Sequence, residues 1–353
     1  MNPAATETTG LPHKDQAHAD PTSRAAEAPL LQRLRGSDAA RRAGIQVLGV
    51  GTFYLAIVAY FWISVPVFGT TSNFRNIIDN SVVTGVVALG QTLVLVAGGF
   101  DLSVSGVVAL AGVSYAMLGN AGVPVGLDIL ACLAIGATVG IVNGLIVTKV
   151  RINPLIATLG TLSITTGLAY TISNGVTQPF NVNGIGFLGN KGPLNFSYYT
   201  DVFFALAVIT FLMLRYTAYG RLVYARGGSR EASRLVGIRV DRVSQIVYTL
   251  CGALAAVGGI VVATQLLAGT ATAGTTTALD TISAAVIGGA ALTGGEGGIG
   301  GTVIGVLVLT TIANGLAIKQ VASFYQQIAT GAVLLLAVGF SQLRRMLTGE
   351  PIT

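Results

Sequence analysis

The chain has 353 residues, of which 52% are hydrophobic and only 10% are charged. Soluble domains carry about a quarter charged residues, so this composition excludes a water-soluble globule and predicts an all-α protein that crosses a membrane repeatedly. Both histidines, His13 and His18, lie in the N-terminal tail, which leaves the apolar region without an imidazole and predicts neither a cofactor nor an enzymatic site there.

The N-terminal 42 residues lack apolar periodicity and predict a disordered cytoplasmic tail. Apolar segments then follow one another through a transmembrane domain at 43–343, and their lengths predict about ten transmembrane helices. The short segment at 280–292 and the glycine pair before Asp101 predict a broken or re-entrant helix near 98–105 or 280–292. Residues 344–353 are expected to form a cytoplasmic C-terminal tail. The ten segments are 45–68, 81–99, 102–120, 123–148, 153–174, 201–217, 244–268, 280–292, 300–318 and 322–342.

Charge placement predicts the orientation, because cytoplasmic loops hold the excess of Lys and Arg. With ten passes and a cytoplasmic N-terminus, only Arg75, Lys191 and Lys319 fall outside, and the remaining 17 of 20 cations fall inside. Both termini are therefore expected in the cytoplasm, with a basic cytoplasmic loop at 218–243 and a long external loop at 174–200. The net charge of +6 then reflects membrane orientation rather than binding to nucleic acid.

The basic loop carries a pattern close to the Glu-Ala-Ala-x-x-x-Gly motif of ABC-importer permeases, in which Gly237 is the final glycine. Ser229 can cap a short helix, a glutamate in the first turn suits the helix dipole, and a glycine can end the helix. Such a helix would couple a separate ATPase to the membrane domain. The alternative is a basic loop that only sets topology. The candidate coupling residues are Glu231, Ala232, Ser233, Arg234 and Gly237.

Further segments extend this resemblance over residues 75–340. They are GGFDLSVS at 98–105, NGLIV at 143–147, PLIATLG at 154–160, SNG at 173–175, YGR at 219–221, TAG at 272–274, LDTISAAVIGGAALTGG at 279–295 and NGL at 314–316. In this order they resemble the ribose/xylose/galactose-type permease family of binding-protein-dependent monosaccharide importers. The chain departs from that pattern in its long N-terminal tail and in having Ser233 where the motif has alanine.

The resemblance implies a multi-pass permease of the prokaryotic plasma (inner) membrane that forms a pathway for a monosaccharide. It also implies three partners: a second permease copy or sister permease, a cytoplasmic ABC ATPase, and an extracytoplasmic sugar-binding protein. No Gly-Lys dipeptide occurs in the chain, so it lacks the P-loop that cradles phosphates, and ATP hydrolysis is expected in the partner. Gln178 and Asn181, in the long external loop, are candidates for docking the binding protein.

Candidate pathway residues come from polar positions within the spans. Thr158, Thr161 and Thr165 recur at i, i+3 and i+7, which puts three hydroxyls on one helix face. They could face a sugar, or bond back to carbonyls of their own helix. Asn143 and Asn314 join them as candidates, since a buried amide either lines a pathway or bonds between helices; Asn153 has the same two readings.

The acids nearest the spans lie close to segment ends, where they are expected to reach water. This disfavours an ion-coupled secondary transporter, which needs a buried carboxylate. Asp101 is the acid most readily assigned to the pathway, and a helix N-cap is its alternative role. These acids are Asp79, Asp101, Asp128, Asp201 and Asp280.

Two further alternatives remain open. A permease of the same superfamily could carry another solute, such as a nucleoside, an autoinducer-like sugar or a branched-chain amino acid. A secondary transporter would instead show inverted repeats and midplane charges. The glycine-rich run at 295–300 matches a dinucleotide fingerprint only formally, because it joins two membrane segments. Gly297, Gly301 and Gly305 are spaced for close helix packing instead.

Overall fold

The computed structural model describes residues 48–181, 184–332, 335 and 339. Both tails predicted from the sequence, at 1–42 and 344–353, lie outside the described residues. The chain divides into two units, 1–44 and 45–353, and all described residues belong to the second. This unit confirms an all-α polytopic membrane protein, built from long apolar helices with two short strands.

Six described helices are long and apolar enough to cross a membrane, and three shorter apolar helices accompany them. The last predicted segment is helical over residues 323–332. A count of ten passes therefore remains a prediction. The six long helices are α2 (Thr71–Val96), α4 (Val125–Leu145) continued by the π-helix η1 (Ile146–Val150), α5 (Pro154–Ser173), α6 (Tyr198–Tyr216), α9 (Val240–Leu266) and α11 (Ile299–Ile318); the shorter ones are Leu48–Ser64, α3 (Val104–Asn120) and α10 (Thr277–Ile287).

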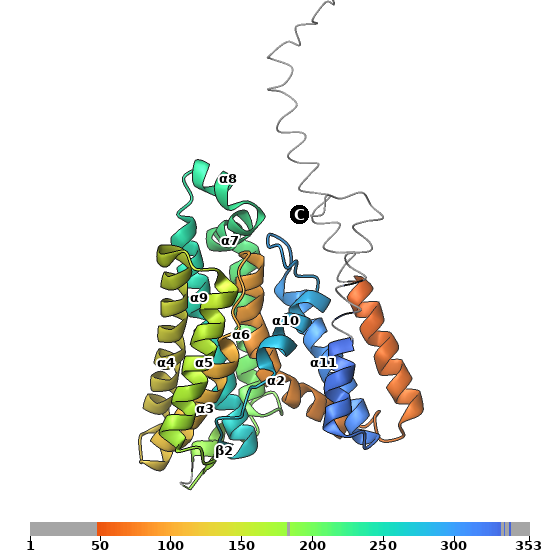
Figure 1. The fold of residues 1–353 in the computed structure, drawn as a ribbon. Coiled ribbons are helices and arrows are strands. Elements are labelled where there is room, and N and C mark those ends of the chain that lie inside the picture. Colours follow the sequence, from red (N-terminus) through yellow and green to blue (C-terminus); the bar gives the residue numbers. More distant parts are fainter. Residues whose placement is uncertain (1–47, 182–183, 333–334, 336–338, 340–353) are drawn as a thin grey trace, which may run out of the picture. The chain divides into compact units, whose positions relative to one another are not determined.

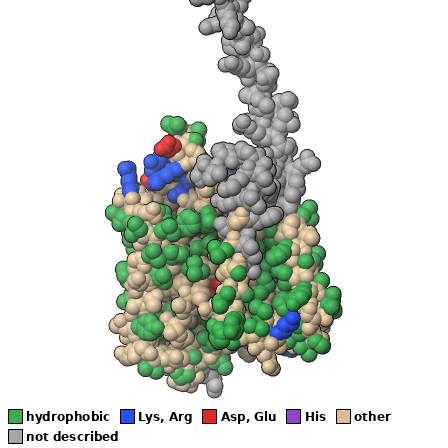
Figure 2. Space-filling model, turned by 45° about the vertical axis from the view of Figure 1, so that its right-hand side comes forward, with side chains coloured by type: hydrophobic (Ala, Val, Ile, Leu, Met, Phe, Trp, Pro, Cys, Tyr) green, Lys and Arg blue, Asp and Glu red, His purple; other side chains and the backbone are tan. Residues whose placement is uncertain are grey.

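Helix α9 is the central element, and α2, α3 and α4 all pack against it (Figure 1). Small residues permit these contacts: a Cβ on Gly252 of α9 would overlap the carbonyl oxygen of Gly136 in α4. Close backbone approach of this kind is how helices associate where lipid supplies no hydrophobic drive. On the face shown in Figure 2, hydrophobic side chains are spread over much of the described surface, as expected for contact with lipid.

Helices α10 and α11 pack together and against α2. A Cβ on Gly301 would overlap Gly288, and one on Gly305 would overlap the carbonyl oxygen of Ala284. This confirms the predicted packing role of Gly301 and Gly305. Gly297 lies before α11, in a turn with φ of 128°, so it belongs to the connection rather than to the helix stripe.

Two connections of non-helical backbone lead into α3 and α10, and the first of them runs inside the bundle. The first, residues 97–103, joins α2 to α3 and confirms the break predicted at 98–105; Gly99, Asp101 and Ser103 are buried there. The second, residues 270–276, follows the strand β2 (Ala268–Gly269) and leads into α10. The second predicted site, 280–292, is not itself the break: it contains most of the short helix α10 and the turn that follows. The break lies just before α10.

The N-terminal ends of α3 and α10 meet, since the backbone N–H of Ala278 donates to the Ser105 hydroxyl at 2.9 Å. Non-helical backbone is tolerated at membrane depth where protein surrounds it. Here the Tyr248 hydroxyl, from α9, donates to the Phe100 carbonyl at 3.0 Å. Each break therefore brings a helix start into the interior of the bundle.

The two ends of the bundle carry different elements (Figure 1). Between α6 and α9 lie α7 (Ala218–Gly228) and α8 (Arg230–Leu235), so the predicted loop at 218–243 is largely helical. We call this end the α8 end. At the β2 end, strand β1 (Gln178–Pro179) pairs antiparallel with β2, with Gln178 opposite Gly269, and the short helix η2 (Ile185–Gly189) follows.

Candidate functional site

The local structure of α8 follows its sequence. The Ser229 hydroxyl accepts from the N–H of Ala232 at 3.2 Å, and Glu231 lies in the first turn. Gly237 has a φ of 83°. Its N–H donates to the Arg234 carbonyl, and the next N–H donates to the Ser233 carbonyl, both at 3.0 Å. These two bonds form a Schellman motif, so the predicted cap and the predicted glycine terminus are both confirmed.

One side of α8 holds it in place and another is exposed. The Ser233 hydroxyl is buried and donates to the Ala225 carbonyl of α7 at 2.8 Å. The serine that departs from the Glu-Ala-Ala pattern therefore joins α8 to α7. Leu235 and Val236, at the end of α8, are 88% and 76% exposed. An apolar pair this exposed at a helix tip is typical of a surface that a partner covers, and sequence reasoning had not selected it.

Two ion pairs join α8 to the start of α9. Arg230 and Arg234 each lie beside Asp241, at 3.1 Å and 3.2 Å from its Oδ1 atom. All three side chains are partly exposed, so the pairs orient α8 more than they stabilise the fold. Lys and Arg side chains gather at this end of the molecule (Figure 2).

Three glycine-containing segments meet beneath α8: the end of α7 and two turns. A Cβ on Gly227, near the end of α7, would overlap the carbonyl oxygen of Val96 at the end of α2. The N–H of Gly295 donates to that same carbonyl at 2.8 Å, and a Cβ on Gly294 would lie 2.6 Å from the Cα of Gly98. We call the turns at 97–98 and 294–295, together with Gly227 of α7, the glycine junction. It joins α7 to the first broken connection, at 97–103, and to the turn between α10 and α11 through backbone contacts.

A tyrosine supports the glycine junction. The Tyr224 hydroxyl, from α7, donates to the Gly297 carbonyl at 2.7 Å. Burial raises the pKa of Tyr224 above its ordinary value, so this hydroxyl keeps its proton and remains a donor. The contact fixes α7 to the turn that precedes α11.

Asp101 anchors the first broken connection through a chain of hydrogen bonds. Its Oδ1 atom accepts from the Ser103 N–H at 3.0 Å and the Ser103 hydroxyl at 2.6 Å. The Asn143 amide donates to that hydroxyl at 2.8 Å, and the Thr161 hydroxyl donates to Asn143 at 2.8 Å. The network links α4 and α5 to residues 97–103. Because α3 begins at Val104, beyond this Asx-type turn, Asp101 does not cap the helix.

The expectation that the acids near the spans reach water was wrong for three of them, including Asp201, whose two carboxylate oxygens are both buried. Asp101 and Asp128 are both fully buried. Asp101 lies in the connection that runs inside the bundle. Asp128 lies on the face of α4 that contacts α3, where the neighbouring Cys132 thiol lies 3.5 Å from the Ala111 carbonyl. Their places near segment ends did not reveal this, because burial depends on packing: the connection that holds Asp101 runs inside the bundle, and Asp128 faces α3.

Two of the three threonines chosen from the sequence bond to their own helix. Thr158 and Thr165 donate to the carbonyls of Pro154 and Thr161, both at 2.8 Å, whereas Thr161 donates to Asn143 and only lies near the Ala157 carbonyl, at 3.3 Å. All three are buried. Their face of α5 packs on α3, where a Cβ on Gly106 would overlap the Thr165 hydroxyl. A role in a pathway stays a prediction for these threonines.

The asparagines also bond within the fold. The side-chain amides of Asn314 in α11 and Asn73 in α2 donate to each other's carbonyl oxygens at 3.0 and 3.1 Å. Asn153 accepts from the N–H of Leu155 at 2.9 Å and thereby caps α5. Asn143 and Asn314 therefore hold helices together in this structure, as the interhelical alternative predicts, while their part in transport remains a prediction.

A cavity of about 340 Å³ lies beside the starts of α3 and α10. It is bounded by α3, by α5 and by the broken connection at 271–275. Among the described residues that line it none is charged. Six carry hydroxyl groups: Ser105, Ser163, Thr166, Tyr170, Thr272 and Thr275.

Sequence reasoning missed this cavity, although its signal was present. Ser163, Thr166 and Tyr170 recur at i, i+3 and i+7 along α5, which is the same spacing as Thr158, Thr161 and Thr165. Because both sets have the same helical spacing, the sequence alone cannot show which of the two polar faces of α5 lines a cavity. Packing of α3 covers one face and leaves the other on the cavity. Three further hydroxyls come from α3 and the broken connection.

The β2 end contains the external loop predicted from the sequence. The Gln178 amide donates to the carbonyls of Ser173 and Val176 at 3.1 and 3.2 Å, so this side chain folds back on the end of α5. Asn181 is exposed, and its N–H donates to the Asn120 side chain at 2.9 Å. Of the two predicted docking residues, Asn181 is the more accessible. Among the described residues, no group of three His, Cys, Asp or Glu side chains could hold a metal ion.

Comparison with known proteins identifies the family. The chain is 38% identical to the ribose import permease protein RbsC of Escherichia coli (strain K12) over 288 residues, which cover 80% of this chain and 90% of that protein. It is 38% identical to RbsC of Bacillus subtilis (strain 168), covering 83% and 92%. It is 35% identical to the L-arabinose transport system permease protein AraH of E. coli (strain K12), covering 80% and 86%.

No solved structure matched the chain. Residues 73–338 match the family described as the permease component of the branched-chain amino acid transport system. The match spans α2 to the C-terminal segment and includes α8, the glycine junction and the hydroxyl-lined cavity. Since both the family match and the permease relatives cover most of its length, this chain belongs to that family of transport-system permeases.

Proposed function

We propose that this chain is the membrane-spanning permease subunit of an ABC importer and forms the pathway for a monosaccharide. The observation that carries the proposal is the uncharged, hydroxyl-lined cavity between α3, α5 and residues 271–275. Hydroxyl groups act as both donors and acceptors, which suits a solute that itself carries several hydroxyls. The ribose and arabinose permeases among its relatives support the same solute class.

The position of the cavity also provides a route by which ATP hydrolysis could be coupled to movement of the solute. Its lining includes Ser105, one residue beyond the start of α3, and Thr272 and Thr275, which precede α10. The glycine junction links α7 to the connection that leads into α3 and to the turn that follows α10. A shift of α8 would therefore reach the cavity through backbone contacts, as coupling between two bistable sites requires.

The proposed function requires three partner proteins. An ABC ATPase would bind at the α8 end, where Leu235, Val236 and the coupling residues other than Ser233 are exposed, and would hydrolyse the ATP. An extracytoplasmic sugar-binding protein would dock at the β2 end. A second copy or sister permease would complete the pathway in the prokaryotic inner membrane, with both termini in the cytoplasm.

We expect removal of a cavity hydroxyl to slow uptake. Thr166→Val keeps the side-chain shape but removes a donor and an acceptor, so uptake should fall by about fivefold to thirtyfold, the effect of roughly 1–2 kcal/mol. Thr171→Val is the matched control, because Thr171 is exposed on the same helix and its hydroxyl bonds to the Gly167 carbonyl.

The measurement is uptake of labelled pentoses into proteoliposomes that hold this chain, its ATPase and its binding protein. Vanadate inhibition separates an ATP-driven importer from a secondary transporter. Competition by nucleosides or branched-chain amino acids tests the other solute classes. Equal uptake by both variants, or uptake that needs no ATP, would argue against the proposal.

At the β2 end we expect Asn181→Trp to weaken docking of the binding protein. The added indole would project from an exposed position and disturb a flat contact. Stimulation of ATPase activity by the binding protein should fall several-fold. Asn181→Ala is the control, since it removes the amide without adding bulk. If both variants keep full stimulation, this loop only covers the end of the bundle.

A further inference from the structure

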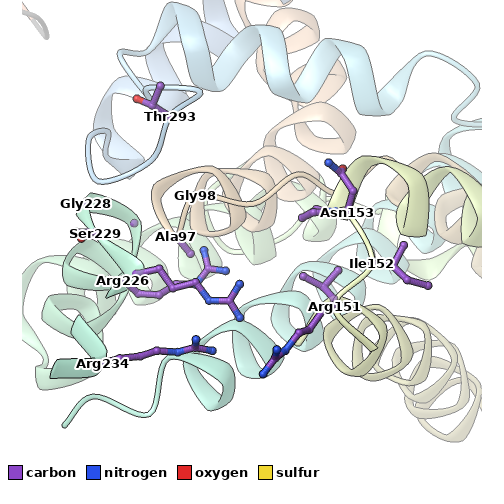
Figure 3. A pocket seen from close by; sticks show the side chains of 14 residues that line it. Ala97, Gly98, Arg151, Ile152, Asn153, Arg226, Gly228, Ser229, Arg234 and Thr293 are labelled. Carbon is purple, nitrogen blue, oxygen red and sulfur yellow. The ribbon is translucent and has the colours of Figure 1, made fainter. Parts of the chain in front are cut away.

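A second and larger cavity, of about 630 Å³, opens at the α8 end. It lies between α7 and α8, the turn at 97–98 and the connection from η1 to α5. Four arginines line it, and no Asp or Glu is among the lining residues: Arg151, Arg226, Arg230 and Arg234. In Figure 3 the guanidinium groups of Arg151, Arg226 and Arg234 point toward the same space. We call this cavity the arginine pocket.

Arg226 is the unusual member of the group. Its side chain is only 7% exposed, and its Nε atom has no hydrogen-bond partner among the described residues. Burial lowers the pKa of this guanidinium, and nearby Arg230 lowers it further, while Tyr248 and Asp241 act in the opposite direction. A buried arginine is normally paired, so a buried guanidinium whose end faces a cavity rather than a carboxylate indicates a ligand.

The remaining arginines are also short of partners. Asp241 accepts from both Arg230 and Arg234 through the same Oδ1 atom, and the Nε atom of Arg230 is buried without a partner among the residues that the structure describes. Arg151 is exposed at the mouth of the pocket. The N-terminus of the 20-residue helix α5, at Asn153 and Pro154, adds the positive end of a helix dipole.

We propose that the arginine pocket binds a phosphate-bearing anion. Guanidinium groups match phosphate oxygens in pairs and are less strongly hydrated than ammonium groups, and such charge-assisted bonds are the strong ones. Several donors here converge from three different elements, which suits a group with several acceptor oxygens better than a single carboxylate. This site is separate from the hydroxyl-lined cavity and does not depend on which solute is carried.

A lipid headgroup is one source of such a phosphate. Basic pockets at the end of a membrane bundle bind anionic headgroups, and apolar residues beside the pocket are exposed: Val150, Ile152 and Ile156 at 65%, 40% and 66%. Acyl chains could lie along these residues while the phosphate enters the pocket. The other source is a soluble phosphate compound, which the same guanidinium groups would hold.

The experiment uses the full chain. Retention of phosphatidylglycerol against a phosphatidylcholine background is measured by native mass spectrometry, and inorganic phosphate is titrated by calorimetry in detergent. Arg226→Gln and Arg151→Gln should each weaken binding about tenfold or more, the effect of losing a charged hydrogen bond. Arg242→Gln is the matched control, because Arg242 is exposed in the same basic segment and lies outside the pocket lining.

The lipid-retention and phosphate-titration measurements distinguish the two possible sources of the phosphate group. Selective, Arg226-dependent retention of phosphatidylglycerol supports a lipid headgroup, and Arg226-dependent binding of phosphate alone supports a soluble ligand. Arg151→Gln guards against a folding defect, since Arg151 is exposed. Binding of neither probe, or binding unchanged in both pocket variants, overturns the proposal. Occupation of the pocket only by an acidic segment of the ATPase would overturn it as well.

Discussion

Replacing Gly237 with tryptophan is expected to reduce sugar uptake by about tenfold or more, within the usual range of a coupling free energy. Nothing lies within 4 Å of a Cβ at this position, so an added side chain would project into the space where the ATPase is proposed to dock. The bulk would separate the partner from the exposed end of α8. Uptake into proteoliposomes and co-purification of the ATPase measure the two effects.

Backbone strain could also lower uptake in this variant. Gly237 has a φ of 83°, and a side chain there costs roughly 1–2 kcal/mol. Gly237→Ala carries that strain without the bulk and therefore serves as the control. We expect the alanine variant to keep most of its uptake. If Gly237→Trp also keeps uptake and assembly, α8 is not the coupling element.

Replacing Gly227 with alanine is expected to have the largest effect within the permease itself. A Cβ there would overlap the Val96 carbonyl and crowd the N–H of Gly295, both of which are backbone and cannot rotate away. Overpacking of this kind costs about 1–3 kcal/mol. It would also separate α7 from the connection that leads into α3 and from the turn between α10 and α11, so uptake should be lost even where the chain remains folded.

The adjacent glycine provides a matched control for this prediction. Gly228 follows in the same helix, and nothing lies within 4 Å of a Cβ built on it. Gly228→Ala should therefore unfold at the temperature of the unmodified chain and transport normally. Thermal unfolding in detergent and uptake are compared for both variants. Equal behaviour of the two alanine variants would show that the glycine junction carries no motion to the cavity.

The sequence predicted those features that depend on neighbouring residues. The Ser229 cap, the first-turn position of Glu231 and the glycine end of α8 were all predicted, because capping is decided within one helical turn. The break before α3 was also predicted, because a glycine pair followed by an aspartate disfavours a continuous helix within an apolar stretch. Family membership followed from the order of many short motifs.

Burial of the acids was not predictable in the same way. Hydropathy places Asp101 and Asp128 near segment ends, and the ends of isolated helices lie at the membrane surface. In the fold, the connection at 97–103 enters the bundle, so Asp101 is enclosed by protein and its bonds go to Ser103. Depth within a bundle depends on contacts between segments distant in the sequence.

Amino-acid composition, local caps and motif order determined by themselves that this chain is an all-α membrane permease with a short capped helix in its basic loop, for which coupling remains a prediction. The tertiary structure alone decided which face of α5 lines a cavity and which arginines meet. Ser163, Thr166 and Tyr170 have the same spacing as the buried threonines, and only the approach of α3 at Gly106 distinguishes the two faces. Arg151 and Arg226 are 75 residues apart, and only the tertiary fold places α7 and the connection from η1 to α5 around one pocket.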